Sequence, residues 1–266
     1  MSNNYPFQVR RHWLLSTLMI PEILDHIFGF LYNEQDYTTL EACSDVYPEI
    51  VDRRLYSDIT LYFNKAVSNK VSYYLCASKF FNILTLRPHV GNHVRVVKIE
   101  LPEASVGGDS IPVISSILPM LPRIESIVLH TGEEYHWPTM DRKFCEAVRN
   151  SLRLPSIKTS LIANFNGFPL DTFEGCINLE KMLLFGKFID GEDPCTSGYP
   201  RLCSLAVDNQ PDFTRIMSWM KSNTLQTLLL RINHYDDFSK FRNLIEACST
   251  TIVNLELSNS TYPGES

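Results

Sequence analysis

The sequence lacks the features that mark several common classes of protein. No stretch approaches the roughly 18 consecutive apolar residues of a transmembrane helix. Glycine and proline are scarce, with 11 and 15 residues in a chain of 266, which excludes collagen-like and low-complexity chains. Hydrophobic residues make up 44% of the chain, so we expect it to fold around a sizeable core.

Positive charge is also in short supply. The formal net charge is −6 at pH 7, and the basic residues are scattered apart from pairs at Arg10 and Arg11 and at Arg53 and Arg54. Proteins that bind nucleic acids usually carry a basic patch, because neutralising phosphates drives their affinity. The sequence therefore predicts neither a nucleic acid nor a membrane as a partner.

Cysteine motifs are absent as well. The chain has 7 cysteines at wide and irregular spacings, without a C-x-x-C, so neither a zinc site nor a disulfide framework is indicated. Free thiols are typical of a reducing compartment, so we expect a cytoplasmic or nuclear location, or both. The apolar run at residues 13–20 is too short for a signal peptide, and Pro21 and Glu22 follow where small residues should stand.

Signatures of catalysis are missing too, since the sequence has no G-x-S-x-G, P-loop lysine or H-E-x-x-H. His89 and His93 have the spacing of a zinc-binding helix, but Pro88 and Gly91 predict that no helix forms there. We therefore expect no catalytic residues, no cofactor and no metal. An enzyme with an unrecognised site remains an alternative.

Among the features that are present, residues 18–31, LMIPEILDHIFGFL, predict an amphipathic helix. Pro21 suits the first turn, and the negative charges of Glu22 and Asp25 suit the positive end of a helix. Apolar side chains recur every three or four positions, at Ile20, Ile23, Leu24, Ile27, Phe28 and Leu31. This apolar stripe is wide enough to contact more than one neighbour.

The next segments alternate between helical and extended patterns. Residues 39–46 predict a short helix, and a helical path resumes at 50–55. Residues 58–63 alternate and are rich in β-branched and aromatic types, which predicts a strand. Residues 71–86 return to helical spacing and stop before Pro88.

From Val94 onward one short pattern returns, apolar-x-x-apolar-x-apolar. Its copies are Val94/Val97/Ile99, Ile124/Ile127/Leu129, Leu179/Met182/Leu184, Leu202/Leu205/Val207, Leu225/Leu228/Leu230 and Ile252/Leu255/Leu257, with a weaker copy at Ile157/Ser160/Ile162. Successive copies start about 22–33 residues apart, in or near the roughly 20–29-residue period of leucine-rich repeats. Pro122, Pro155 and Pro200 each stand two residues before a copy.

Helix-like segments lie between the copies, at 111–118, 142–152, 213–221 and 238–248. A strand–helix unit has one apolar face that is too small to bury alone, whereas stacked units bury a continuous core and form a curved parallel sheet. A compact α/β domain with the same elements is the alternative. The asparagine position of well-formed repeats is largely empty, with Asn209 and Asn259 coming nearest.

Repeat proteins usually bind their partners on the concave surface that carries the strands. The residues expected to point outward on that surface are Lys98, Val128, Leu183, Ala206, Leu229 and Glu256. Because they mix aliphatic and charged types, they indicate no substrate class, and the substrate-binding residues stay unknown.

The first 60 residues resemble the F-box families that are common in fungi. Residues 20–31, IPEILDHIFGFL, resemble the opening F-box helix, residues 40–46, LEACSDV, its second helix, and residues 53–61 the exit into a first strand. Residues 94–260 resemble the leucine-rich-like region that often follows. In two departures, the proline-to-glutamate spacing is one residue shorter than in L-P-x-E, and the usual C-R-x-W run is absent.

The resemblance implies an α/β chain with a small N-terminal helical F-box-like module at 1–60, a linking strand and helix at 61–93, and an irregular leucine-rich-repeat-like solenoid with a parallel sheet at 94–266. It also implies a substrate receptor of a cullin–RING ubiquitin ligase of the SCF type. Such a receptor binds a protein substrate and docks a Skp-type adaptor, and through it the cullin. The implied adaptor contacts are Ile20, Pro21, Ile23, Leu24, Ile27, Leu31 and Val46.

The missing tryptophan motivates a second reading, in which the chain is a repeat-based scaffold that no longer binds the adaptor. The last copy of the pattern ends at Leu257, and residues 262–266 are too short to cap an apolar edge. We therefore expect that the terminal strand is exposed, that the chain is a fragment, or that it pairs with a partner, and the sequence predicts low stability or self-association at that edge.

Overall fold

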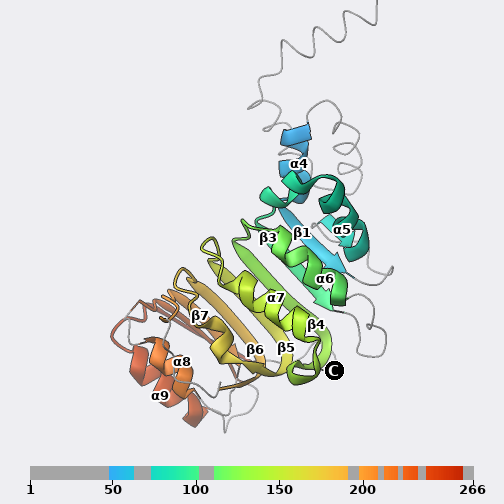
Figure 1. The fold of residues 1–266 in the computed structure, drawn as a ribbon. Helices are drawn as coiled ribbons and strands as arrows, with labels where there is room; N and C mark the ends of the chain where they lie inside the picture. The colour runs from blue at the N-terminus through green and yellow to red at the C-terminus, as the bar shows by residue number, and fades with distance from the viewer. Residues whose placement is uncertain are drawn as a thin grey trace, which may run out of the picture.

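The computed structural model describes residues 48–62, 73–101, 111–190, 198–208, 213–220, 224–232 and 238–259. These residues form a mixed α/β fold in which nine parallel strands make one sheet (Figure 1). The strand order is β2-β1-β3-β4-β5-β6-β7-β8-β9, so β3 lies beside β1, and from β4 onward each strand lies beside the strand before it in the chain.

The strands differ in length, and the central ones are the longest. They are β1 (Asp58–Tyr62), β2 (Tyr73–Cys76), β3 (Val96–Leu101), β4 (Ser126–His136), β5 (Thr159–Pro169), β6 (Lys181–Ile189), β7 (Ser204–Asp208), β8 (Thr227–Ile232) and β9 (Asn254–Asn259). The α-helices are α4 (Pro48–Tyr56), α5 (Ala77–Leu86), α6 (Ile111–Ile117), α7 (Arg142–Leu152), α8 (Thr214–Trp219) and α9 (Phe238–Cys248). Short 3-10 helices are η1 (Pro88–Asn92), η2 (Leu118–Met120), η3 (Trp137–Thr139) and η4 (Leu170–Phe173).

The last two positions of every copy of the predicted apolar pattern lie on a strand, the first position precedes it, and the copies are in register. The middle position forms one row across β3 to β9, made of Val97, Ile127, Ser160, Met182, Leu205, Leu228 and Leu255. The last position forms a second row of Ile99, Leu129, Ile162, Leu184, Val207, Leu230 and Leu257. Strand β1 adds Ile59 and Leu61 to the two rows, which the sequence pattern did not predict.

The turn before each strand repeats the same pair of hydrogen bonds. The carbonyl oxygen of Ser57 accepts from the backbone N–H groups of Arg95 and Val96, both at 2.9 Å. At the far end, the carbonyl oxygen of Gln226 accepts from Val253 and Asn254, at 2.8 and 3.0 Å. The acceptors in between are Arg95, Glu125, Lys158, Glu180 and Cys203. One backbone geometry therefore recurs from β1 to β9.

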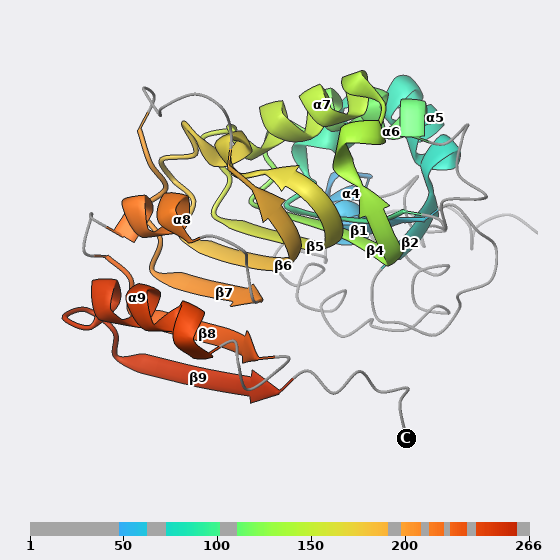
Figure 2. The same ribbon diagram turned by 90° about the horizontal axis from the view of Figure 1, so that it is seen from below.

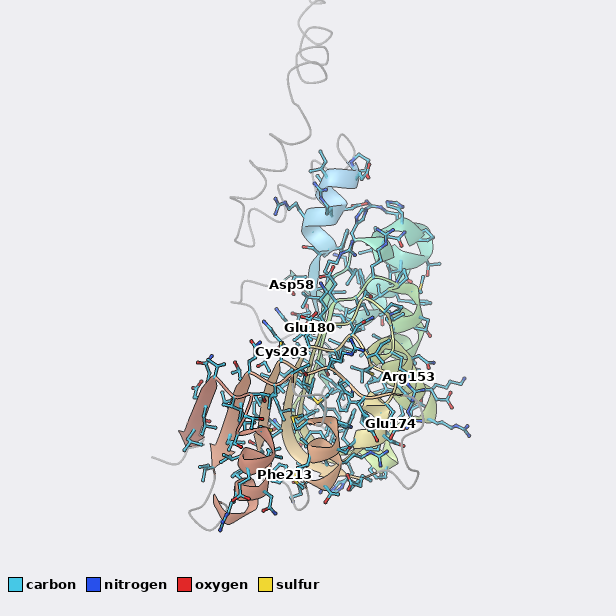
Figure 3. All side chains as sticks on the ribbon, turned by 90° about the vertical axis from the view of Figure 1, so that its left-hand side faces the viewer. Asp58, Arg153, Glu174, Glu180, Cys203 and Phe213 are labelled. Carbon is cyan, nitrogen blue, oxygen red and sulfur yellow. The ribbon has the colours of Figure 1, made fainter. Side chains whose placement is uncertain are left out.

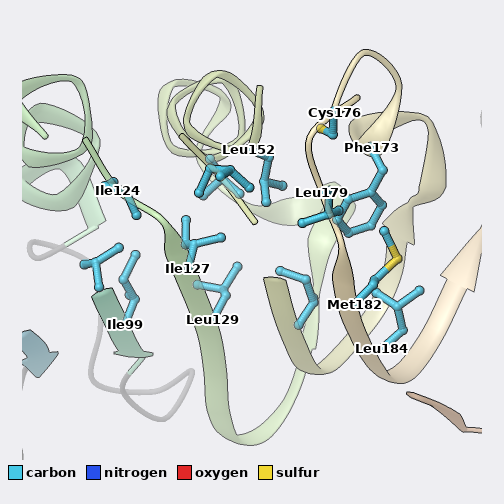
Figure 4. Close-up of a cluster of buried hydrophobic side chains, with 14 of the residues drawn as sticks. Ile99, Ile124, Ile127, Leu129, Leu152, Phe173, Cys176, Leu179, Met182 and Leu184 are labelled. Carbon is cyan, nitrogen blue, oxygen red and sulfur yellow. The ribbon is translucent and has the colours of Figure 1, made fainter. Parts of the chain in front are cut away.

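Helices α5 to α9 lie on one side of the sheet, and the core lies between the two layers (Figure 2). Side chains alternate along a strand, so the two pattern rows point toward the helices and their neighbours point away. Figure 4 shows Ile127 and Leu129 beneath the helix that carries Leu152, and all three side chains are fully buried. Asp141 caps that helix, since its carboxylate accepts from the N–H of Phe144 at 2.9 Å.

Aromatic side chains fill the core where β4, β5 and β6 extend beyond their neighbours. Trp137 lies at the centre, with its ring 4.4 Å from that of Phe168 and 5.6 Å from that of Phe165. Phe173 continues the cluster from Phe168 to Trp219, at ring distances of 5.8 and 6.0 Å. These rings and the short helices η3 and η4 occupy the layer above β5 and β6.

The prediction of a helix over residues 71–86 is wrong in its first part, because Tyr73–Cys76 form strand β2 and the helix begins at Ala77. These residues pair in register with Ile59 to Tyr62 of β1, so a ladder of hydrogen bonds outweighs the helical spacing. His89 lies on the 3-10 helix η1, a helical turn that the sequence had not predicted. The predicted strand at 58–63 and the helices at 111–118, 142–152 and 238–248 are confirmed. The helix predicted at 213–221 is shorter, at Thr214–Trp219.

In the part of the chain that the structure describes, none of the helices has the length and apolarity needed to cross a membrane.

Candidate protein-interaction surface

The face of the sheet opposite helices α5 to α9 carries one continuous row of side chains, which we call the outward row. Register places its members side by side on neighbouring strands: Thr60, Lys98, Val128, Leu161, Leu183, Ala206, Leu229 and Glu256. All the positions predicted to point outward from the sequence are in this row. Thr60 and Leu161 extend it, because β1 and β5 belong to the same repeating register.

The centre of the outward row is aliphatic and is flanked by Lys98 and Glu256, and Thr60 beyond Lys98 is a buried polar residue. Val128, Leu161, Leu183 and Leu229 are half-buried, and Ala206 between the last two is buried. On one side of this centre the ammonium of Lys98 lies 3.1 Å from a carboxylate oxygen of Asp58, and on the other side Glu256 is exposed. The row therefore offers an apolar strip across β4 to β8, flanked by polar groups.

A polar cluster lies beside the apolar strip, toward the carboxyl ends of β6, β7 and β8. The guanidinium of Arg231 stacks over the ring of Phe185, 4.8 Å from its centroid. Its Nε lies 3.9 Å from Oδ1 of Asp208. Burial raises the pKa of Asp208 to about 6, against the opposing effects of Arg231 and of the backbone N–H of Gly186. Because the ring fixes the guanidinium, the cluster sets a cation at a defined place beside the strip.

The two sides of the fold carry different kinds of polar contact (Figure 3). Asp58, Glu180 and Cys203 lie along the sheet, where Glu180 and Cys203 form the repeated junction bonds. Arg153 and Glu174 lie on the helical side, where Arg153 Nε donates to the carbonyl oxygen of Glu174 at 3.1 Å. The carboxylate of Glu174 pairs with Arg215. Glu174 thus connects Arg153, which follows α7, to Arg215 on α8, away from the outward row.

Sequence reasoning missed Asn164, which holds two central strands together. Its backbone is left-handed, with φ of 64°, and its Nδ2 donates to the carbonyl oxygen of Thr131 at 2.7 Å. Asn164 stands at the same distance after the start of its pattern copy as Asn209 and Asn259 stand after theirs. That shared offset was the signal that would have identified it.

Of the two histidines with metal-like spacing, His89 contacts a buried carboxylate, and His93 packs against the ring of His89. Nε2 of His89 lies 3.0 Å from the fully buried carboxylate of Asp52, which also pairs with Arg87. Burial lowers the pKa of His93, and Asp52 opposes that effect. Among the described residues, no group of three His, Cys, Asp or Glu side chains could hold a metal ion.

The cysteines within the described ranges, Cys76, Cys145, Cys176, Cys203 and Cys248, are free thiols. Burial raises the pKa of Cys145 to about 11, with Asp141 adding to the effect. Burial also raises the pKa of Cys176 to about 12 and that of Cys248 to about 11. These three thiols are protonated at neutral pH, which makes them weak nucleophiles.

The implied adaptor contacts at Ile20, Pro21, Ile23, Leu24, Ile27, Leu31 and Val46 lie outside the described residues. The helical path predicted at 50–55 is present as α4. No model of a known protein family matches the sequence, and a comparison with curated proteins finds no match either.

Proposed function

We propose that this chain is a protein-binding protein without catalytic activity, which serves as the substrate-recognition subunit of an SCF-type cullin–RING ubiquitin ligase. In this proposal the outward row binds a protein substrate, and the N-terminal helices dock a Skp-type adaptor. The single observation that carries it is the register of the repeated pattern, which aligns one face of neighbouring strands into a continuous surface.

An irregular leucine-rich-repeat-like solenoid accounts best for this architecture. Strands from β3 to β9 follow chain order, and the junction bonds from Ser57 to Gln226 repeat at each step. A doubly wound α/β domain would instead carry helices on both faces of its sheet, whereas α5 to α9 here lie on one side (Figure 2). The unequal spacing of the copies, and the absence of asparagine from its expected position in most of them, explain why the repeat is irregular.

The outward row has the composition of a protein interface. Its centre is aliphatic and without charge, and the charged side chains of Lys98 and Glu256 flank that centre on either side. Interfaces are similarly depleted of charge at the core and polar at the rim. Arg231, fixed over Phe185, adds the kind of residue that is enriched among strong interface contacts.

Helix α4 belongs to the 1–60 segment that resembles an F-box, and it directly precedes strand β1. Its Asp52 is fully buried and pairs with Arg87 and with His89, which lie between α5 and the end of η1. A buried carboxylate with two partners fixes the orientation of the helix that bears it. A substrate receptor needs such a rigid connection, because it must hold the substrate at a fixed place relative to the adaptor.

Co-purification of the full chain with a Skp-type adaptor tests the docking half of the proposal. The unaltered chain should retain the adaptor, and the double variant Ile23→Asp, Ile27→Asp should lose it. Leu86→Asp is the matched control, because Leu86 is 82% exposed on α5 and stands outside the segment that resembles an F-box. If the unaltered, folded chain captures no adaptor, the docking half of the proposal is wrong.

Affinity purification with mass spectrometry tests the outward row. The double variant Leu183→Asp, Leu229→Asp should lose proteins that the unaltered chain and Leu86→Asp both retain. Circular dichroism and thermal melting must show that the double variant is folded. An unchanged set of partners in a folded double variant would show that substrates bind elsewhere.

A scaffold that no longer binds the adaptor is the second candidate. The observation that favours it is the absence of the C-R-x-W run, in place of which the sequence reads Tyr47-Pro48-Glu49-Ile50. This candidate predicts that the outward-row variant loses its partners although the unaltered chain never captures the adaptor. The two purifications together therefore separate the candidates.

A further inference from the structure

Strand β9 ends the sheet with its core-facing side chains partly uncovered. In the described ranges β9 pairs with β8 along one edge, and no strand pairs with its other edge. Leu255 and Leu257 are 47% and 50% exposed, although Leu228 and Leu230 beside them in the same rows are fully buried. The edge therefore combines unpaired backbone groups with exposed leucines, a combination that favours pairing with another strand.

The peptide groups of the two leucines point toward this open edge. Asn254 donates its backbone N–H to Gln226, at 3.0 Å, so it directs its peptide groups toward β8. In a parallel ladder alternate residues bond to the same neighbour, so Glu256 and Ser258 do the same. Leu255 and Leu257 thus present their N–H and C=O groups to whatever lies beyond the edge.

The sequence of β9 is nearly symmetric about Glu256. Reading outward, Leu255 and Leu257 flank it, and Asn254 and Ser258 follow as small polar residues. We propose that β9 pairs antiparallel with β9 of a second copy of this chain, about a two-fold axis through Glu256. A two-fold axis through Glu256 places each residue opposite the residue that lies equally far on the other side of Glu256 in the second copy. In this strand the two leucines therefore face each other, and the two small polar residues do the same.

This register agrees with the direction of the backbone groups. Leu255 of one copy lies opposite Leu257 of the other, and the two residues exchange both of their backbone hydrogen bonds. Their side chains meet on the helical side of the joined sheet, where each covers the other. Asn254 lies opposite Ser258 of the second copy on the outward side.

Glu256 is the unfavourable element in this arrangement. It lies opposite Glu256 of the second copy in a non-hydrogen-bonded pair, where side chains come closest. Like charges directly opposite each other destabilise strand pairing, and the net charge of −6 adds a general repulsion. A single short strand also buries less surface than a standard stable interface. Pairing is therefore weak, and it strengthens as the salt concentration rises.

Sedimentation equilibrium of the full chain tests the proposal through the charge of Glu256. Glu256→Gln should tighten the dimer by roughly three- to tenfold, because it removes the repulsion. Glu256→Lys alone should stay weak, whereas an equimolar mixture of Glu256→Lys with the unaltered chain should form a tighter heterodimer. Glu180→Lys, at another exposed glutamate, is the matched control and should leave association unchanged.

Cross-linking tests the register itself. Glu256→Cys places two cysteines opposite each other at a separation that a disulfide spans, so oxidation should link two copies through residue 256. Ser258→Cys should form no such link, because Asn254 lies opposite it. Peptide mass spectrometry distinguishes these links from those of the native cysteines.

The edge leucines supply the last variant. Leu255→Asp should abolish association of the folded chain, and Leu86→Asp, at an exposed leucine away from the edge, should not. If the Glu256→Gln variant stays monomeric at all accessible concentrations, the proposal is overturned. So would a mixture of opposite charges that associates no more tightly than either protein alone.

Discussion

The side chain of Asn164 on β5 donates a hydrogen bond to the carbonyl oxygen of Thr131 on β4, with Nδ2 at 2.7 Å. Oγ1 of Thr131 donates to the carbonyl oxygen of Glu133 and lies 3.3 Å from the carbonyl oxygen of Asn164. Thr131 is fully buried, and it lies within the shift of strand register between His130 and Tyr135. The pair therefore supplies side-chain bonds where the backbone ladder is interrupted, and it holds the central strands together as they extend toward the aromatic cluster.

Replacing Asn164 should destabilise the fold. Asn164→Ala removes the bond to a buried carbonyl and places alanine in a left-handed conformation, so we expect a loss of about 1–3 kcal/mol in the free energy of unfolding. Asn164→Gly keeps the conformation accessible and should lose less than Asn164→Ala. Urea unfolding measures both, with Asn166→Ala as the control on the same strand. Equal stability of Asn164→Ala and the unaltered chain would contradict this role.

The sheet could be predicted from the sequence because one local pattern repeats. The strand register holds even where the pattern is broken. Ser160 is a polar residue at an apolar position, yet it pairs in register between Ile127 and Met182. Backbone pairing on both sides fixes the strand even where the side chain departs from the pattern. Two-residue alternation then determines which side chains point outward, which is why Leu183 and Leu229 were predictable.

Other features depend on contacts between residues that are distant in the sequence. Strand β2 forms because β1 offers a free edge, and nothing within residues 73–76 encodes that edge. The ring contacts of Trp137 with Phe165 and Phe168 join η3 to β5. The pairing of Asp208 with Arg231 follows only from the register of β7 with β8, since both residues are unremarkable in the sequence.

Gly186 is a position where a methyl group should not be tolerated. A Cβ atom there would lie 2.5 Å from the carbonyl oxygen of Phe165, and the φ of 141° is one that L-residues rarely adopt. Gly186→Ala should therefore lower the free energy of unfolding by about 1–3 kcal/mol. Gly132→Ala is the matched control, because a Cβ atom at Gly132 would meet nothing within 4 Å. Equal urea midpoints for the two variants would contradict the assignment.

Leu183 and Leu184 are neighbours on β6 that face opposite sides of the sheet. Leu184 is fully buried beneath the helical layer, so Leu184→Ala should cost about 2–5 kcal/mol of stability. Leu183 is half-buried on the outward row, so Leu183→Ala should cost less than half as much. Chemical denaturation of both variants checks the ratio. A larger loss for Leu183→Ala would mean that the outward row is part of a core rather than a surface.

The carboxyl group of Asp208 should make stability depend on pH in an unusual direction. Burial raises its pKa from 3.8 to about 6, so the folded chain binds this proton more tightly than the unfolded chain does. The stability that protonation supplies is fully present below about pH 4 and is lost as the pH rises through about 6. Asp208→Asn removes this dependence on pH. The free energy of unfolding of the unaltered chain, relative to that of the variant, should therefore fall by about 1–2 kcal/mol between pH 4 and pH 7. This energy includes a reduction for the partial exposure of the carboxyl group to solvent. Urea unfolding at intervals of pH measures the difference, and Glu180→Gln controls for the loss of an exposed carboxylate. A difference that stays constant with pH, or that grows as the pH rises, would show that Asp208 is not held in a buried environment beside Arg231.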